Sequence, residues 1–264
     1  MPREFRGAWI ASVAHIDWPS RRGLDTAAQR AELQRTVAQA AGLGLNALLL
    51  QVRPSADALY RSALEPWSEF LTGASGRAPD DDWDPLAEWV AAAHAAGLEL
   101  HAWFNPYRAW HPSARGEPAA THVARARPEL VRRHGDLLWL DPAEPAAAAH
   151  TRAVVRDVLQ RYDVDGVHID DYFYPYPLEG QDFADDGPWQ RYRAGGGTLA
   201  RADWRREQVD RLVQDLHADV HAVRPHARFT ISPFGLPRPD RRPPGIEGFS
   251  QYDRLYAHVE RWLA

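Results

Sequence analysis

The 264-residue sequence contains no cysteine. This absence excludes disulfide bonds, thiolate metal sites and cysteine nucleophiles, and it leaves the cellular compartment open. No run of about 18 apolar residues is present, so no membrane span is expected. Basic residues are not in excess, because Lys and Arg number 31 against 36 Asp and Glu, for a formal charge of −5. Without a basic stripe, a nucleic-acid partner is not favoured.

The amino-terminal stretch "MPREFRGAWI" enters an expected strand almost at once and shows no signal-peptide pattern. No GxGxxG follows that strand, which argues against a dinucleotide-binding fold. The sequence is rich in one residue type, tryptophan, of which it contains 11. Most of them are expected in the core, and the others can offer flat faces to sugar rings.

Apolar β-type runs alternate with helical patterns along the whole chain. Strands are expected at 5–10, 46–52, 98–105, 137–140, 164–170 and 227–232. Helices are expected at 25–44, 84–97, 141–162, 201–223 and 252–264, with long loops at 175–197 and 233–248. Such alternation predicts parallel strands joined by right-handed crossovers. Polar and aromatic clusters come just after the strands, where a (β/α) barrel carries its catalytic residues.

We therefore expect an α/β fold of the (β/α)8 TIM-barrel type. Five clear strands and the short 137–140 account for only five or six of the eight βα units. The prediction is a single barrel domain over residues 1–264 that is truncated at its carboxyl terminus. A missing side would leave the first and last strands with unpaired backbone groups.

Several motifs, taken in order, resemble the bacterial glycosyl hydrolase-like family 10. They include "FRGAWIASV", "NALLLQVRPSADALY", "HAWFNPYR", "YDVDGVHIDDYFYP" and "ISPFG", and the resemblance runs from about residue 4 to the end. It implies a TIM-barrel glycosidase that acts on bacterial glycan, with peptidoglycan glycan strands as the leading substrate. It also implies a cell-envelope or secreted location and further strands beyond "ISPFG". No cofactor is expected.

The stretch 164–171 holds the first candidate for catalysis. Glycoside hydrolysis usually needs two carboxyl groups that flank the scissile bond. In a strand, His168 and Asp170 share one face, and this polar face should meet the substrate at the strand end. Asp170 is therefore the first candidate carboxylate. Asp171 begins the loop and is the second candidate for catalysis; the alternatives are that it binds a substrate hydroxyl, holds the loop backbone or caps a turn.

Neighbouring strands supply the candidate binding residues. Arg53 directly follows the second strand, where it either orients a carboxylate and lowers its pKa or forms a surface salt bridge. His101, Trp103 and Asn105 share one face of the third strand and can bind sugar, although a core histidine and a turn-forming asparagine are alternatives. Glu65 is a further acid on a long loop. The other expected substrate-binding residues are Tyr107, His168, Tyr172, Tyr174, Asp17 and Trp18. Asp17 is also a candidate second acid, with helix or turn capping as the favoured alternative.

Two other functions remain open at the level of sequence. A metal-dependent hydrolase on a barrel could use His15, Asp17, His101, His168 and Asp170 as ligands, although the first-strand His-x-His of many such barrels is absent. A non-catalytic glycan-binding protein is the second alternative. The sequence does not indicate an oligomeric state.

Overall fold

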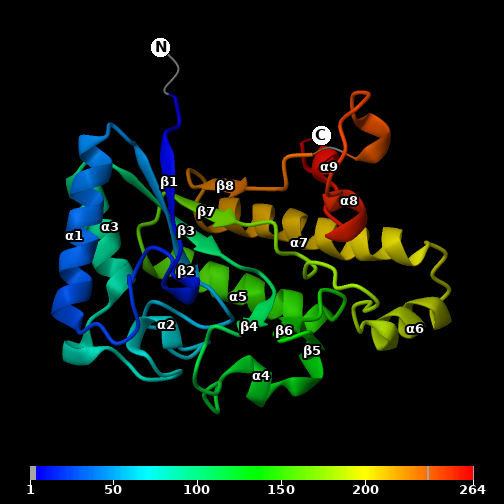
Figure 1. The fold of residues 1–264 in the computed structure, drawn as a ribbon, viewed down its shortest axis with the longest axis horizontal. Coiled ribbons are helices and arrows are strands. Elements are labelled where there is room, and N and C mark those ends of the chain that lie inside the picture. The colour runs from blue at the N-terminus through cyan, green and yellow to red at the C-terminus, as the bar shows by residue number, and fades with distance from the viewer. Residues whose placement is uncertain (1–3, 237, 264) are drawn as a thin grey trace.

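Figure 1 shows the computed structural model, which describes residues 4–236 and 238–263. Its centre is a parallel sheet of five strands in the order β1-β2-β3-β7-β8. The strands are β1 (Gly7–Ile10), β2 (Ala47–Arg53), β3 (Glu99–Phe104), β7 (Gly166–Ile169) and β8 (Arg228–Ile231). Every neighbouring pair is parallel, which confirms the expected alternation and forms part of a (β/α) barrel.

Four long helices cover the outer face of this sheet. They are α1 (Thr26–Gly42), α3 (Pro85–Ala95), α5 (Pro145–Arg161) and α7 (Arg201–Val223); α1 lies beside α3, and α5 lies beside α7 (Figure 1). The carboxylate of Asp25 caps α1 by accepting a hydrogen bond from the Ala28 amide at 2.7 Å, as expected. The expected start of α5 at Asp141 is wrong, because Asp141 instead closes a turn onto the Ala143 amide and Pro145 opens the helix.

The prediction of a barrel strand at 137–140 is also wrong. This segment is β6 (Leu137–Leu140), which pairs antiparallel with β4 (Arg108–Trp110) and β5 (Val131–His134) in a separate three-stranded sheet. The small sheet is inserted between β3 and α5, beside the carboxyl-terminal ends of the parallel strands. The parallel sheet therefore has five strands within the described residues.

Shorter helices complete the chain. They are α2 (Glu69–Thr72), α4 (Val123–Ala126), α6 (Asp186–Ala194), α8 (Gln251–Arg254) and α9 (Val259–Trp262), with 3-10 turns at Val13–His15, Asp80–Asp82, Pro128–Leu130 and Pro239–Arg241. The expected loop at 175–197 thus contains α6. The expected single helix at 252–264 is broken, because Tyr256 has a left-handed backbone with φ of 58°. No helix in the described part of the chain is long and apolar enough to cross a membrane.

The inner face of the sheet is strongly curved. Trp9 on β1 donates its indole N–H to Nε2 of His168 on β7 at 3.1 Å. In a flat sheet these strands would lie about 14 Å apart, since three spacings of ~4.8 Å separate them. The same imidazole also contacts the Thr230 hydroxyl on β8 at 2.8 Å. Trp9 is nonetheless 59% exposed, because the inner face is open on the side where the barrel is incomplete.

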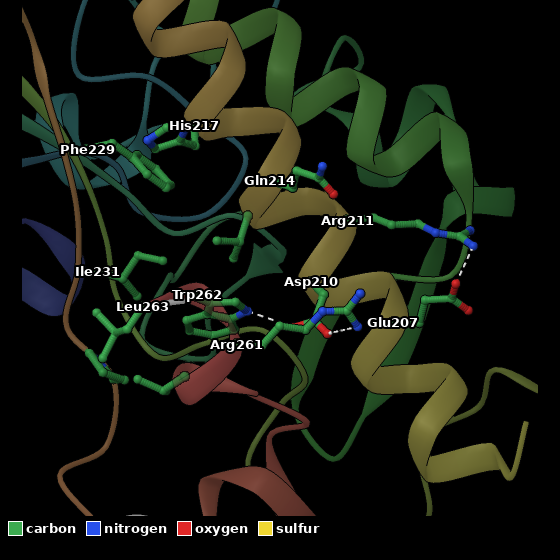
Figure 2. A pocket seen from close by; sticks show the side chains of 13 residues that line it. Glu207, Asp210, Arg211, Gln214, His217, Phe229, Ile231, Arg261, Trp262 and Leu263 are labelled. Atoms are coloured by element: carbon green, nitrogen blue, oxygen red, sulfur yellow. Dashed lines mark hydrogen bonds and ion pairs between the residues drawn. The ribbon is translucent and has the colours of Figure 1, made fainter.

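A groove of about 920 Å³ lies on the opposite, outer side of β8 (Figure 2). Phe229 and Ile231 line it from the strand, His217 from α7 and Trp262 from α9. The indole of Trp262 donates to Asp210 of α7 at 2.7 Å and anchors α9 there. Strand alternation directs Phe229 and Ile231 away from the inner face, so this groove does not belong to the polar site at the strand ends.

Candidate active site

Asp170 lies just beyond the carboxyl end of β7 and is only 5% exposed. Its Oδ2 accepts hydrogen bonds from the indole of Trp103 and the side-chain amide of Asn105, both at 3.1 Å. Its Oδ1 accepts the backbone N–H of Tyr172 at 3.2 Å. The pairing of Trp103 with His168 in adjacent strands brings these groups together. Three donors from three directions therefore fix the orientation of this carboxyl group.

The surroundings of Asp170 raise its pKa toward neutral pH. Burial raises the pKa of Asp170 to about 6, although the nearby Arg108 and the hydrogen bond from Trp103 oppose this rise. Arg108 is itself buried, with its guanidinium 5.2 Å from the ring centre of Tyr172 and its Nε donating to the Pro54 carbonyl at 2.8 Å. A carboxyl group with such a pKa is suited to proton transfer or nucleophilic attack at physiological pH.

Asp171 lies next in the chain and is half-buried. The phenol of Tyr176 donates to its Oδ2 at 2.5 Å, and burial raises the pKa of Asp171. Its backbone carbonyl accepts the Phe173 amide at 3.0 Å, so the main chain of Asp171 forms the turn while its side chain is bonded by Tyr176.

His168 lies below Asp170 on the same face of β7, in edge-to-face contact with Trp103. Its Nε2 accepts from the indole of Trp9, which can only donate, so the proton is on Nδ1 and is donated to Thr230. Burial lowers the pKa of His168 to about 4. The imidazole is therefore neutral at physiological pH and supports the site by hydrogen bonding.

Arg53 is fully buried, so it stabilises the residues around the site and does not lie at the site's surface. Its guanidinium binds both oxygens of Glu65, with a shortest distance of 2.6 Å, and donates to the Asn105 carbonyl at 2.7 Å. Burial alone would raise the pKa of Glu65, but Arg53 and His150 lower it to about 2. The expected pairing of Arg53 with a carboxylate is thus present, and it fixes the turn that carries Asn105.

Five other expected binding residues lie away from the Asp170 carboxylate or inside the core. His101 is buried and contacts Glu99 at 3.0 Å, and Trp18 is buried with its indole on the Gln29 carbonyl. Asp17 is exposed and caps the Ala11 amide at 2.8 Å. The remaining two, Tyr107 and Tyr174, are fully buried in irregular segments. Strand alternation does not hold in such segments, so side-chain direction there was not predictable.

The chain matches the description "Glycosyl hydrolase-like 10" over residues 4–264. It belongs to this family. Among relatives, glycosyl hydrolase YngK of Bacillus subtilis is 39% identical over 99% of this chain and 52% of its own length. Glycosyl hydrolase DigH of Escherichia coli K12 is 33% identical over 98% of this chain and 62% of its own length. The chain therefore spans between about half and two thirds of these relatives.

Solved structures with the same fold are glycosidases of low sequence identity. An α-L-fucosidase from Paenibacillus thiaminolyticus aligns with 90% of this chain and 34% of its own, with a TM-score of 0.58 and 13% identity. A chitobiase from Flavobacterium johnsoniae aligns with 86% and 31%, with a TM-score of 0.54 and 13% identity. At such identities the similarity establishes the TIM-barrel-like fold of this glycosyl hydrolase-like chain and nothing finer.

The ligands that a metal-dependent hydrolase would need do not converge in this family member. His15 contacts the Pro19 carbonyl, His101 contacts Glu99, and His168 is held between Trp9 and Thr230. Within residues 4–236 and 238–263, no group of three His, Asp or Glu side chains is placed to hold one ion. The site instead presents adjacent carboxyl groups surrounded by N–H donors and aromatic rings.

Proposed function

We propose that this chain is a glycoside hydrolase acting on bacterial glycan, with peptidoglycan glycan strands as substrate. The observation that carries the proposal is Asp170, a buried carboxyl group at a strand end with its pKa raised to about 6 and three N–H donors around it. Membership of the glycosyl hydrolase-like 10 family supports this chemistry. The peptidoglycan substrate is supported by the family resemblance of the motifs.

We assign the two carboxyl roles to Asp170 and Asp171. The three donors favour the ionised form of Asp170, which suits attack on the sugar or activation of water. Burial raises the pKa of both carboxyl groups, so the number of partners distinguishes them. Asp171 has only the Tyr176 phenol as side-chain partner, and we assign it to proton transfer. Trp103 and Asn105 orient Asp170, and the partly exposed ring of Trp103 can contact the sugar.

The experiment is release of reducing ends from purified peptidoglycan glycan strands. Asp170→Asn should abolish release while glycan binding persists, because the side chain keeps its size and loses its ionisable group. Asp163→Asn is the matched control and should keep activity, since Asp163 is an exposed carboxylate paired with Arg224 before the start of β7, at the opposite end of that strand from Asp170. Full activity in Asp170→Asn would disprove the assignment. Tightly held zinc in the purified protein would favour the metal-dependent alternative.

A second candidate, glycan binding without turnover, follows from the open sheet. We propose that residues 4–263 form one domain and part of a larger barrel, because β1 and β8 are free edges within the described chain. If the missing units carry groups needed for turnover, this chain would bind glycan strands and release no reducing ends. A single cooperative unfolding transition would support the one-domain proposal, and two separate transitions would disprove it.

A further inference from the structure

Four aromatic rings lead away from Asp170 along the carboxyl-terminal ends of the strands. Tyr172 bonds Asp170 through its backbone, and its ring lies 5.3 Å from that of Tyr176. Tyr176 is 5.2 Å from Phe249, and Phe249 is 5.0 Å from Phe234, between ring centres. The rings therefore form a continuous row from the loop after β7 to the loop after β8. We call these four residues the aromatic row.

The loop after β8 is folded so that its two ends meet at the aromatic row. Gly248, just before Phe249, has φ of 144°, and a Cβ there would lie 2.6 Å from Cδ1 of Leu236. Glycine thus allows the chain to pass this close to Leu236. Arg242 donates to the carbonyls of Gly248 and Phe249 at 3.0 and 3.3 Å. The close approach at Gly248 and the hydrogen bonds from Arg242 therefore hold Phe249 against Phe234, although 15 positions separate the two rings.

The rings of the aromatic row are only partly buried, unlike those of Phe173 and Tyr174 in the same loop. Polar groups accompany them, since the Tyr176 phenol contacts Asp171 and the Arg108 guanidinium lies against the Tyr172 ring. Flat apolar faces beside hydrogen-bonding groups match the two kinds of surface that a pyranose presents. The row is also continuous with the carboxyl groups of the proposed active site.

We propose that the aromatic row forms successive sugar-binding subsites, so that the chain binds a glycan polymer across several residues and acts at internal bonds. This inference rests on the proposed function for the position of bond cleavage. The part that does not depend on cleavage concerns binding. Affinity should increase with the length of the glycan, because longer chains reach Phe249 and Phe234 while a disaccharide at Asp170 does not.

The test measures binding of N-acetylglucosamine oligomers, from the dimer upward, by calorimetry. Asp170→Asn serves as the parent so that binding is measured without cleavage. Phe249→Leu in this background removes the flat ring and keeps apolar volume, and it should weaken binding of long oligomers about tenfold while leaving the dimer unchanged. Phe249→Tyr keeps a ring and should bind like the parent. Phe5→Leu is the matched control, because Phe5 is an exposed ring beside His101 at the opposite end of the sheet.

Affinity that does not increase with length in the parent, or that Phe249→Leu leaves unchanged at every length, overturns the subsite proposal. Failure of the proposed function looks different. Length-dependent binding that Phe249→Leu abolishes, with no reducing ends released by the unmodified chain, would retain the subsites and disprove hydrolysis. Release of reducing ends with binding independent of length would retain hydrolysis and disprove the subsites.

Discussion

Replacing Asp170 by asparagine should stabilise the protein progressively as the pH rises. Burial raises the pKa of Asp170 from its ordinary value of 3.8 to about 6, so the folded state holds this proton more tightly than the unfolded state. Ionisation of Asp170 therefore lowers the free energy of unfolding. The cost is absent below about pH 4, where both states are protonated, and complete above about pH 6, where both are ionised.

The size of the effect follows from the shift. A difference of about two pKa units at 1.36 kcal/mol each corresponds to about 3 kcal/mol. Asparagine does not titrate, so the stability of the variant minus that of the unmodified protein should grow by about this amount between pH 4 and pH 7. Any hydrogen bonds that asparagine fails to make shift this difference by a constant and do not change its dependence on pH.

Urea unfolding of both proteins, followed by tryptophan fluorescence between pH 4 and pH 8, measures this difference. Asp171→Asn is a useful comparison, because its pKa is raised in the same direction and its half-exposed side chain is partly screened by water, so the growth should be smaller. A difference for Asp170→Asn that stays constant or shrinks as the pH rises would refute the argument that burial controls this carboxyl group.

Three further predictions concern the support of the site. Glu65→Gln should lower the free energy of unfolding by about 3 to 5 kcal/mol at pH 7, because it leaves Arg53 buried without its partner; the advantage of glutamate should fade as the pH drops from 4.5 toward 2, and a loss under about 1 kcal/mol in urea unfolding would contradict the reasoning. Gly166→Ala should cost about 1 to 3 kcal/mol in thermal unfolding, because the new Cβ would lie 2.5 Å from Nδ1 of His101; full stability would show that the ring can move aside. Trp103→Ala should weaken glycan binding and leave the fold intact, and global unfolding in circular dichroism would instead make it a core residue.

Strand periodicity predicted the centre of the candidate site. Two predictions rest on the two-residue repeat of a strand. His101, Trp103 and Asn105 should share one face of the strand at 98–105, and His168 and Asp170 should share one face of the strand at 164–170. The structure brings Trp103 and Asn105 to Asp170 because β3 and β7 are neighbours. His101 is two positions nearer the start of its strand, so it lies beside Phe5 and Glu99 rather than at the site.

Long-range pairing explains what the sequence could not predict. The run 137–140 is apolar enough for a barrel strand, but its partners β4 and β5 were not recognisable as strands, and they draw it into the antiparallel sheet. Arg108 lies near Asp170 at the start of β4, which was not recognisable as a strand, and Tyr176 contacts Asp171 from irregular backbone. No expected strand period therefore gave the direction of either side chain. Their only sequence signal was their position just after the strands that end at Asn105 and Asp170.

The imidazole of His168 has a consequence for the dynamics of the sheet. It receives a hydrogen bond from Trp9 on one edge strand and bonds to Thr230 on the other. Edge strands ordinarily fray independently, but here opening either edge breaks a bond at the same buried ring. The amides of β1 and β8 should therefore exchange with deuterium as one cooperative unit, and His168→Ala should let the two edges exchange at separate rates.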